Sequence, residues 1–208
     1  MGVPEELRGL AEVVFGIRLP LANAYADLLS DTGVEWGLIG PREVDRIWER
    51  HILNSVCLEP LLPLGCWVAD LGSGAGLPGM PLAIARPDLH IDLVEPMGRR
   101  TKFLQLCLSV LGLEDSVRVI QLRAQDYRGG VPVLTCRALA SVKELIEMTA
   151  HLVPPGELLA IKGDKVDSEL AAAHSGRLSR QLKTEVLRPT IAGATLGTVL
   201  RVWREPEH

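Results

Sequence analysis

A glycine-rich segment at residues 68–79 carries the clearest chemical signal in the sequence, and it reads Val-Ala-Asp-Leu-Gly-Ser-Gly-Ala-Gly-Leu-Pro-Gly. It follows an apolar run and precedes a helical pattern, which is the setting that a nucleotide-binding loop requires. Glycines allow the backbone to adopt positive φ and to approach a ligand closely. Gly72, Gly74, Gly76 and Leu77 are therefore candidate cofactor-binding residues.

Two acids near this loop indicate the kind of nucleoside ligand. Asp70 lies two residues before the first glycine, where a carboxylate would repel a pyrophosphate but would suit ammonium and sulfonium charges. S-adenosylmethionine carries both charges. Pro78 removes a backbone donor that a pyrophosphate would need. Glu95 ends the next apolar run, and its carboxylate can accept both ribose hydroxyls in either cofactor class. Together these residues favour S-adenosylmethionine over NAD.

Two later strand ends add candidates at the same edge of the expected sheet. In methyltransferases with this kind of sheet, the corner at residues 121–126 faces the adenine. Ala124 would leave room for the ring and Gln125 or Asp126 could bond the exocyclic amine, although a surface loop would look much the same. Arg137 ends the following strand, at the edge where doubly wound sheets bind ligands. We expect Arg137 to lie beside the transferable methyl group and its acceptor.

The residues around Arg137 restrict the acceptor. Methylation of an exocyclic amine usually needs an Asn/Asp-Pro-Pro-aromatic loop, which this sequence lacks. Methylation of a pyrimidine carbon needs a cysteine nucleophile, and Cys136 has no accompanying acid or proline. A ring nitrogen such as guanine N7 has an in-plane lone pair and no proton to lose, so positioning and electrostatics suffice. We therefore assign no base, nucleophile or metal ligand, and Arg137 is the expected orienting residue.

Charge is distributed unevenly along the 208 residues. The net charge of −4 argues against bulk adhesion to nucleic acid. Residues 96–137, however, carry seven basic and three acidic side chains, directly after the glycine-rich segment. This basic region fits a nucleic-acid substrate, and Arg99, Arg100 and Lys162 are the predicted RNA contacts. Because Arg99 and Arg100 lie beyond Glu95, charge reversal there is expected to weaken RNA binding and to spare the cofactor.

Composition places the chain among ordinary globular proteins. Hydrophobic residues make up 47% and charged residues 23%, and no apolar run approaches the roughly 18–20 residues of a membrane span. The N-terminus lacks the layout of a signal peptide. The four cysteines are far apart in the sequence, which favours reduced thiols over a zinc site. We expect a cytoplasmic monomer that binds neither a metal nor a membrane.

The elements that must position these residues change character near residue 60. Residues 1–60 are expected to form a helical subdomain packed on the core, with helices at 4–14, 20–29 and 41–54 and a break at 33–40. Residues 61–208 alternate strands (66–71, 89–94, 117–122, 131–136, 157–161, 184–187, 195–203) with helices (80–86, 99–111, 142–152, 167–174). This is an α/β, Rossmann-like domain with a mostly parallel sheet of about seven strands. The last two strands should form an antiparallel edge pair, because residues 188–194 are too few for a helical crossover.

Five stretches of sequence, taken together, are more specific than the glycine loop alone. They are Ile-Trp-Glu-Arg-His-Ile-Leu-Asn-Ser at 47–55, residues 70–83, Glu95 with Arg-Arg-Thr-Lys-Phe-Leu at 99–104, Cys-Arg-Ala-Leu-Ala-Ser at 136–141, and Ala-Ile-Lys-Gly at 160–163. Over about residues 20–165 the chain resembles the bacterial 16S ribosomal RNA guanine-N7 methyltransferase family, also called the glucose-inhibited division protein B family.

That resemblance implies a class I methyltransferase fold and methyl transfer from S-adenosylmethionine to N7 of one guanine in small-subunit ribosomal RNA. The residues that match the family's cofactor pattern are Gly72, Leu77, Ala124, Gln125 and Arg137. The family often has Glu at the position of Gln125 and Asp at that of Asn54. His51 is interpreted as a packed, hydrogen-bonded histidine that joins the helical part to the sheet.

Three alternatives remain open at this point. A methyltransferase of a small molecule or protein would keep the same cofactor loop, and the basic region argues modestly against it. A non-catalytic, ribosome-associated binding module would account for Gln125 and Asn54. A nicotinamide oxidoreductase is disfavoured by Asp70 and Pro78.

Overall fold

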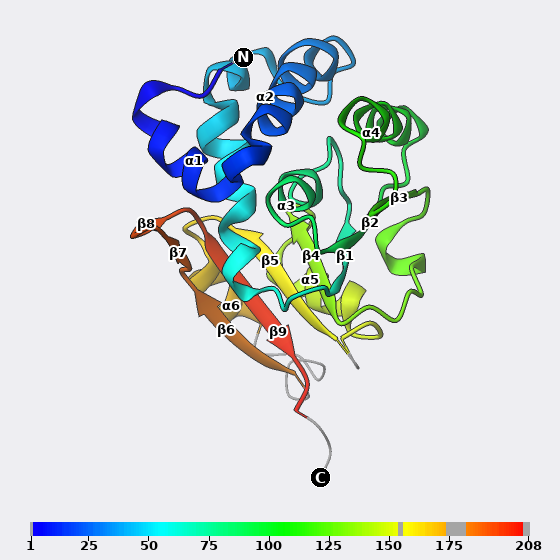
Figure 1. Ribbon diagram of the computed structural model, residues 1–208. Helices are drawn as coiled ribbons and strands as arrows, with labels where there is room; N and C mark the ends of the chain where they lie inside the picture. The colour runs from blue at the N-terminus through cyan, green and yellow to red at the C-terminus, as the bar shows by residue number, and fades with distance from the viewer. Residues whose placement is uncertain (1, 154–155, 174–181, 206–208) are drawn as a thin grey trace.

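A single twisted sheet forms the centre of the protein (Figure 1). The computed structural model describes residues 2–153, 156–173 and 182–205. The strands lie in the order β3-β2-β1-β4-β5-β9-β6. Their bounds are β1 Trp67–Leu71, β2 His90–Val94, β3 Val117–Ile120, β4 Val133–Arg137, β5 Glu157–Lys162, β6 Lys183–Leu187 and β9 Thr198–Trp203. The first five run parallel, and β9 lies antiparallel between β5 and β6. The predicted seven strands and antiparallel edge are confirmed.

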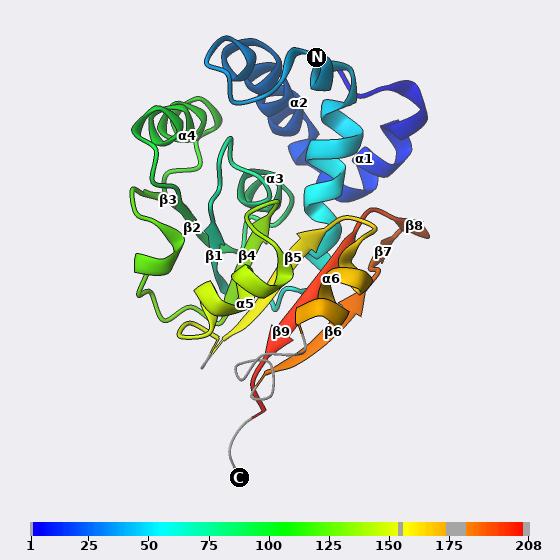
Figure 2. The ribbon, with the colours of Figure 1, turned by 180° about the vertical axis from the view of Figure 1, so that it is seen from behind.

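Helices cover both faces of the sheet, as strand–helix alternation predicts. Helices α3 (Gly79–Ala85) and α4 (Gly98–Leu111) pack on one face together with the N-terminal segment. Helices α5 (Val142–Thr149) and α6 (Val166–Ala173) cover the other face, as the reverse view shows (Figure 2). The central strands are buried on both sides, which explains their continuous apolar sequence. The predicted helix at 167–174 is confirmed up to Ala173, and residue 174 lies outside the described residues.

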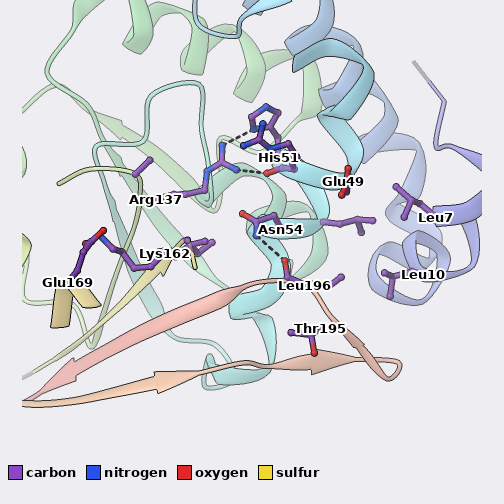
Figure 3. A pocket seen from close by; sticks show the side chains of 15 residues that line it. Leu7, Leu10, Glu49, His51, Asn54, Arg137, Lys162, Glu169, Thr195 and Leu196 are labelled. Carbon is purple, nitrogen blue, oxygen red and sulfur yellow. Dashed lines mark hydrogen bonds and ion pairs between the residues drawn. The ribbon is translucent and has the colours of Figure 1, made fainter. Parts of the chain in front are cut away.

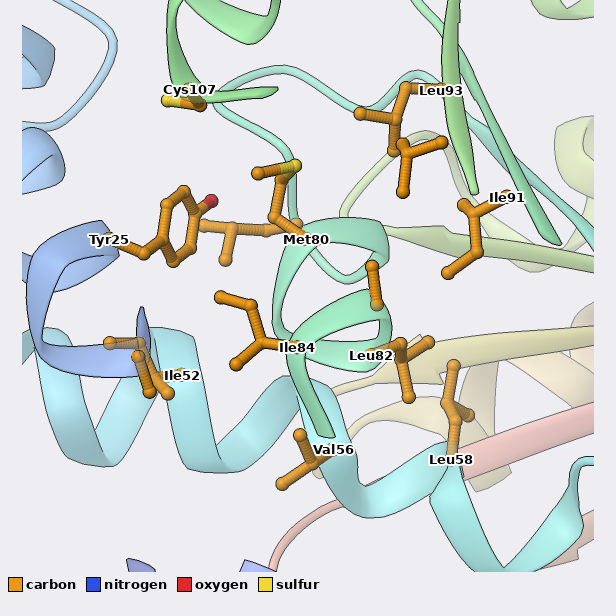
Figure 4. Close-up of a cluster of buried hydrophobic side chains, with 14 of the residues drawn as sticks. Tyr25, Ile52, Val56, Leu58, Met80, Leu82, Ile84, Ile91, Leu93 and Cys107 are labelled. Atoms are coloured by element: carbon orange, nitrogen blue, oxygen red, sulfur yellow. The ribbon is translucent and has the colours of Figure 1, made fainter. Parts of the chain in front are cut away.

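The N-terminal segment is built into the main core. It contains α1 (Arg8–Phe15) and α2 (Leu19–Leu28), each preceded by a short 3-10 turn (Glu5–Leu7 and Gly16–Arg18). Side chains of this segment, such as Tyr25 and Ile52, pack against Met80 and Ile84 of α3 in one continuous hydrophobic cluster (Figure 4). The division of the chain at residue 60 stays a prediction.

The segment after α2 departs from the expected secondary structure. A π turn (Leu29–Gly33) prolongs the helix into the predicted break, and the helix ends only after residue 35, where a turn follows. The helix expected at 41–54 is helical but irregular: a 3-10 turn (Pro41–Arg46) leads into a π-helix (Ile47–Leu53) and then another 3-10 turn (Val56–Leu61). The predicted helix is therefore present, but its winding is 3-10 and π over most of its length. Wider π turns, which are often found at functional sites, bury the apolar side chains at 47, 48, 52 and 53.

The C-terminal strand also differs from the expectation. Residues 195–203 do not form one strand, because β9 begins only at Thr198. A hairpin of β7 (Thr190–Ile191) and β8 (Ala194–Thr195) precedes it. Its two turn residues, Ala192 and Gly193, have φ of 50° and 79°. Two-residue hairpins need this left-handed backbone, but Ala-Gly lacks the usual Asn-Gly or Asp-Gly signature.

Three expectations from composition concern a membrane span, a metal site and the cysteines. No helix in the described part of the chain is long and apolar enough to cross a membrane. No group of three or more His, Cys, Asp or Glu side chains in those residues is arranged to hold a metal ion. Cys57, Cys66, Cys107 and Cys136 are all buried, which confirms their predicted place in the interior.

Candidate active site

The glycine-rich loop follows β1 and is held by hydrogen bonds on two sides. The backbone amides of Gly72 and Ser73 donate to Val94 O of β2 at 2.8 and 3.1 Å. On the other side, the hydroxyl of Tyr25 in α2 donates to Ala75 O at 2.8 Å. The loop therefore owes its position both to the neighbouring strand and to the N-terminal helices.

The three glycines of the predicted loop motif have different surroundings. All have positive φ: 71° at Gly72, 59° at Gly74 and 102° at Gly76. At Gly76 a Cβ would lie 2.4 Å from the side chain of Met80, so this glycine serves packing and faces the core. At Gly74 a Cβ would meet nothing closer than a backbone oxygen at 3.9 Å, because this glycine faces a cavity. The structure thus separates a packing glycine from a ligand-facing one.

Asp70 is completely buried beneath the loop. Its Oδ2 accepts a hydrogen bond from the Gly79 amide at 3.0 Å and so anchors the start of α3. Its Oδ1 is buried without a hydrogen-bond partner among the described residues. Burial raises the pKa of this carboxyl to about 7. An unpaired buried acceptor is costly, which makes this oxygen a fitting partner for a donor such as the ammonium group of S-adenosylmethionine.

Glu95 follows β2 and is also buried. Its Oε2 accepts from the Gly74 amide at 2.9 Å and its Oε1 from the Met97 amide at 3.0 Å. The guanidinium of Arg100 lies 3.5 Å from Oε2. Each carboxylate oxygen can accept more than one hydrogen bond, so Glu95 keeps acceptor capacity for ribose hydroxyls. The prediction that Arg100 lies apart from the cofactor machinery was wrong, because α4 turns this side chain back onto Glu95.

A cavity of about 430 Å³ opens above the loop. The N-terminal segment forms one wall, and the glycine loop and the end of β4 form the other. Of the predicted site residues, it brings together Gly72, Gly74, Leu77, Arg100 and Arg137. Ala124 is buried and Gln125 exposed in a 3-10 turn (Ala124–Asp126) after β3, and neither lines this cavity. Their predicted contact with adenine stays a prediction.

Arg137, at the end of β4, joins the sheet to the π-helix. Its Nη1 donates to Arg50 O at 2.8 Å and its Nη2 donates to His51 Nδ1 at 2.9 Å (Figure 3). The next residue, Ala138, has a φ of 51°, an uncommon conformation for a residue other than glycine. The chain therefore turns sharply directly after Arg137. The interpretation of His51 as a hydrogen-bonded link between the two parts is confirmed.

The bond from Arg137 also fixes the state of His51. A guanidinium only donates, so Nδ1 must accept and the neutral ring carries its proton on Nε2. Nε2 lies 3.3 Å from Glu43 Oε2. Burial, and then the charge of Arg137, lower the pKa of His51 to about 4. His51 is therefore neutral near pH 7 and already engaged, which suits a positioning residue better than a general base.

His51 should make the stability of the fold depend on pH. The unfolded chain takes up a proton below the ordinary pKa of 6.5, whereas the folded chain resists protonation until about 4. The stabilisation that comes from keeping His51 neutral is fully present above about pH 6.5 and is lost as the pH falls toward 4. Between about pH 7.5 and pH 5 this costs about 2 kcal/mol of unfolding free energy. In urea unfolding, His51→Asn, which keeps an acceptor for Arg137, should lose less stability over this range than the parent; an equal loss would contradict the assignment.

A second cavity of about 600 Å³ lies beyond the Arg137–His51 bridge (Figure 3). The two cavities share Arg50, His51, Arg137 and Ala138. The ends of β4 and β5 meet here with the π-helix, the N-terminal turn and the loop before β9. Lys162 lines this cavity, but its ammonium group lies 2.8 Å from Glu169 Oε2 and donates to Ala140 O at 3.0 Å. Lys162, one of the predicted RNA contacts, is therefore held in an internal ion pair.

Comparison with known proteins assigns the family. The sequence model described as GidB, rRNA small subunit methyltransferase G, matches residues 18–191. A protein named ribosomal RNA small subunit methyltransferase G from Acidothermus cellulolyticus is 48% identical over 190 residues, covering 90% of this chain and 85% of its own length. The protein of that name from Mycolicibacterium smegmatis is 50% identical over 166 residues, covering 77% and 70%.

The chain belongs to the rRNA small subunit methyltransferase G family. The predicted family resemblance is therefore confirmed, and the protein is an S-adenosylmethionine-dependent methyltransferase. Distant structures share the fold of this chain. Magnesium protoporphyrin IX methyltransferase from Synechocystis with bound S-adenosylmethionine has a TM-score of 0.58 at 13% identity and covers 89% of this chain and 97% of its own. A variant of MtNAS in complex with S-adenosylmethionine has a TM-score of 0.60 at 16% identity, covering 98% and 80%.

Proposed function

We propose that this protein transfers the methyl group of S-adenosylmethionine to N7 of one guanine in 16S ribosomal RNA. The observation that carries the proposal is the position of Arg137. Its guanidinium lies at the boundary of two cavities, one on the glycine loop and one open for an acceptor. The family's name supports a small-subunit rRNA substrate. We expect the protein to work in the cytoplasm as a monomer.

The chemistry around Arg137 supports a ring nitrogen as the acceptor. Cys136 is buried, and burial raises the pKa of its thiol to about 12, so it cannot supply a thiolate nucleophile near pH 7. His51 is neutral and hydrogen bonded to Arg137. Guanine N7 needs neither a nucleophile nor a base, because its lone pair is already available. Bound S-adenosylmethionine supplies an electrophilic methyl group; the chain's task is to align that group and the base.

Each side of the Arg137 boundary has its own proposed role. On the cofactor side, Gly72, Gly74 and Leu77 would face the ligand, Glu95 would hold the ribose, and Asp70 Oδ1 would accept from the ammonium group. On the acceptor side, Arg137 would donate to the oxygen edge of the guanine or to a neighbouring phosphate, as arginines do in nucleic-acid recognition. Lys162 would contact the RNA only after its ion pair with Glu169 has broken.

The direct experiment compares methyl acceptors. Labelled S-adenosylmethionine is offered with small-subunit ribosomal RNA, the assembled small subunit, duplex DNA and short unstructured oligonucleotides. An acidic protein with a local basic face should bind polyanions weakly and recognise a folded RNA by shape. We expect N7-methylguanosine on the RNA or its ribonucleoprotein only. Comparable labelling of random oligonucleotides, or label on protein or small molecules alone, would refute the proposal.

Arg99 and Arg100 should respond differently to charge reversal. Arg99 is exposed at the start of α4, whereas Arg100 lies against Glu95. Arg99→Glu should weaken RNA binding and leave cofactor binding intact. It should also reduce the slope of the logarithm of the RNA-binding constant against the logarithm of salt concentration by about one. Arg100→Glu should weaken both. Calorimetry with S-adenosylmethionine and RNA titrations at several salt concentrations measure these effects, and Lys183→Glu, at the far edge of the sheet, is the control. Equal RNA affinity of Arg99→Glu and the control would contradict the assignment.

The alternatives make different predictions for the same assays. A methyltransferase of another substrate would bind S-adenosylmethionine and leave ribosomal RNA unlabelled. A non-catalytic binding module would bind the cofactor or the small subunit without turnover. The two adjoining cavities at Arg137 favour catalysis over the binding module, because such a module has no need of an acceptor cavity next to the cofactor loop.

A further inference from the structure

The acceptor-side cavity has walls of two kinds. Apolar side chains such as Leu53 and Ile161 line part of it, and polar groups come from the π-helix, β4 and β5. Its volume of about 600 Å³ exceeds that of a single purine base by several-fold. Among the polar groups, Arg137 and Lys162 are donors. A base with donors of its own also needs an acceptor in the wall.

Asn54 is a wall residue whose amide is held in one orientation. Its Nδ2 donates to Leu196 O at 2.9 Å, across 142 positions of sequence. This close approach requires Gly197, because a Cβ there would lie 2.8 Å from Asn54 Nδ2 and 3.0 Å from Cys57 Sγ. With the nitrogen committed to Leu196, the oxygen must point the other way. Figure 3 shows it on the side of Arg137.

The oxygen of this amide is available to a ligand. Asn54 is half-buried and lines the cavity. Within the described part of the chain, no hydrogen bond reaches its Oδ1. An amide oxygen accepts and cannot donate, and the bond to Leu196 prevents the amide from flipping to present its nitrogen. The cavity therefore offers a fixed acceptor close to the guanidinium donors of Arg137.

We infer that Asn54 is a specificity-determining residue whose Oδ1 accepts a hydrogen bond from the 2-amino group of the target guanine. The inference rests on the proposed function. Guanine carries N1–H and an exocyclic 2-amino group on one edge and the O6 and N7 acceptors on the other. The acceptor Asn54 Oδ1 would meet the 2-amino edge, and the donor Arg137 would meet the O6 edge. Adenine has no 2-amino donor, and its 6-amino group would meet the donor side.

Inosine tests this inference, because it is guanosine without the 2-amino group. The substrate is a small-subunit RNA fragment with guanosine or inosine at the position that the wild-type protein methylates. One net hydrogen bond corresponds to about a tenfold preference in kcat/KM for guanosine. In Asn54→Ala the preference should fall below about twofold. The two bases differ in intrinsic N7 reactivity, but this difference cancels when variant and wild type are compared.

Two more variants complete the experiment. Asn54→Leu keeps the approximate size of the side chain but has no acceptor, so it should also lower the preference below about twofold, and it serves if Asn54→Ala does not fold. Thr195→Val removes a neighbouring hydroxyl of the same cavity and should retain the preference. A preference that is unchanged in Asn54→Ala or Asn54→Leu, or lost in Thr195→Val, overturns the inference. If the wild-type protein makes no N7-methylguanosine on either RNA while binding S-adenosylmethionine, the proposed function fails instead.

Discussion

Arg137→Ala is expected to reduce methyl transfer at least about hundredfold, the size of effect seen when one donor is removed from a preorganised site. Two reasons combine. The change removes the guanidinium at the boundary of the two cavities, and it leaves Arg50 O and His51 Nδ1 without their donor. Single-turnover transfer to small-subunit RNA measures the loss, while S-adenosylmethionine binding and thermal unfolding verify that the variant folds.

Two companion variants separate orientation from covalent chemistry. Arg137→Lys keeps a charge but cannot bond Arg50 O and His51 Nδ1 with one planar group, so it should recover little activity. Cys136→Ala alters the adjacent, buried residue and should keep most activity, because N7 methylation forms no covalent enzyme intermediate. A folded but inactive Cys136→Ala would contradict the account and would favour methylation of a carbon atom.

Gly74→Val should abolish measurable binding of S-adenosylmethionine. The φ of 59° at Gly74 is unfavourable for a β-branched residue, and the new side chain would project into the cavity above the loop. The Gly74 amide also donates to Glu95, so a shift of this backbone would move the acid that we propose to hold the ribose. Calorimetric titration with S-adenosylmethionine measures the effect, and the expected loss of affinity exceeds about a hundredfold.

The matched control for this variant is Gly112→Val at the end of α4. Gly112 has a nearly equal φ of 63°, and no described atom lies within 4 Å of where its Cβ would be. Both variants therefore carry a similar backbone strain, but only Gly74→Val places atoms in the cavity. Similar losses of cofactor affinity in the two variants would show that strain, and not occupation of the site, is responsible.

Local patterns predicted the parts of the protein that local physics determines. Apolar runs located the strands, and the glycines located the loop between β1 and α3, because these signals lie within a few residues of each other. Arg137 was found because a parallel sheet brings the carboxyl ends of its strands to one edge. These predictions needed only periodicity and topology.

The acceptor side could not be predicted in the same way. The contact between Asn54 and Leu196 spans 142 residues, and the bond of Tyr25 to the loop spans 50. Such contacts follow from how the N-terminal segment packs, which no local pattern encodes. The π turns at Ile47–Leu53 were also missed, because a π-helix has the same apolar composition as an α-helix and differs only in winding. That winding is what brings His51 to Arg137.

The central claim is that the protein methylates guanine N7 in small-subunit ribosomal RNA. The most direct measurement is mass-spectrometric mapping of the nucleosides of 16S ribosomal RNA from cells with the gene, without it, and with the Arg137→Ala variant in its place. The account predicts one N7-methylguanosine that is present with the wild-type gene and absent in both other strains. An unchanged set of modified nucleosides, or the loss of a methyl group from another atom, would contradict it.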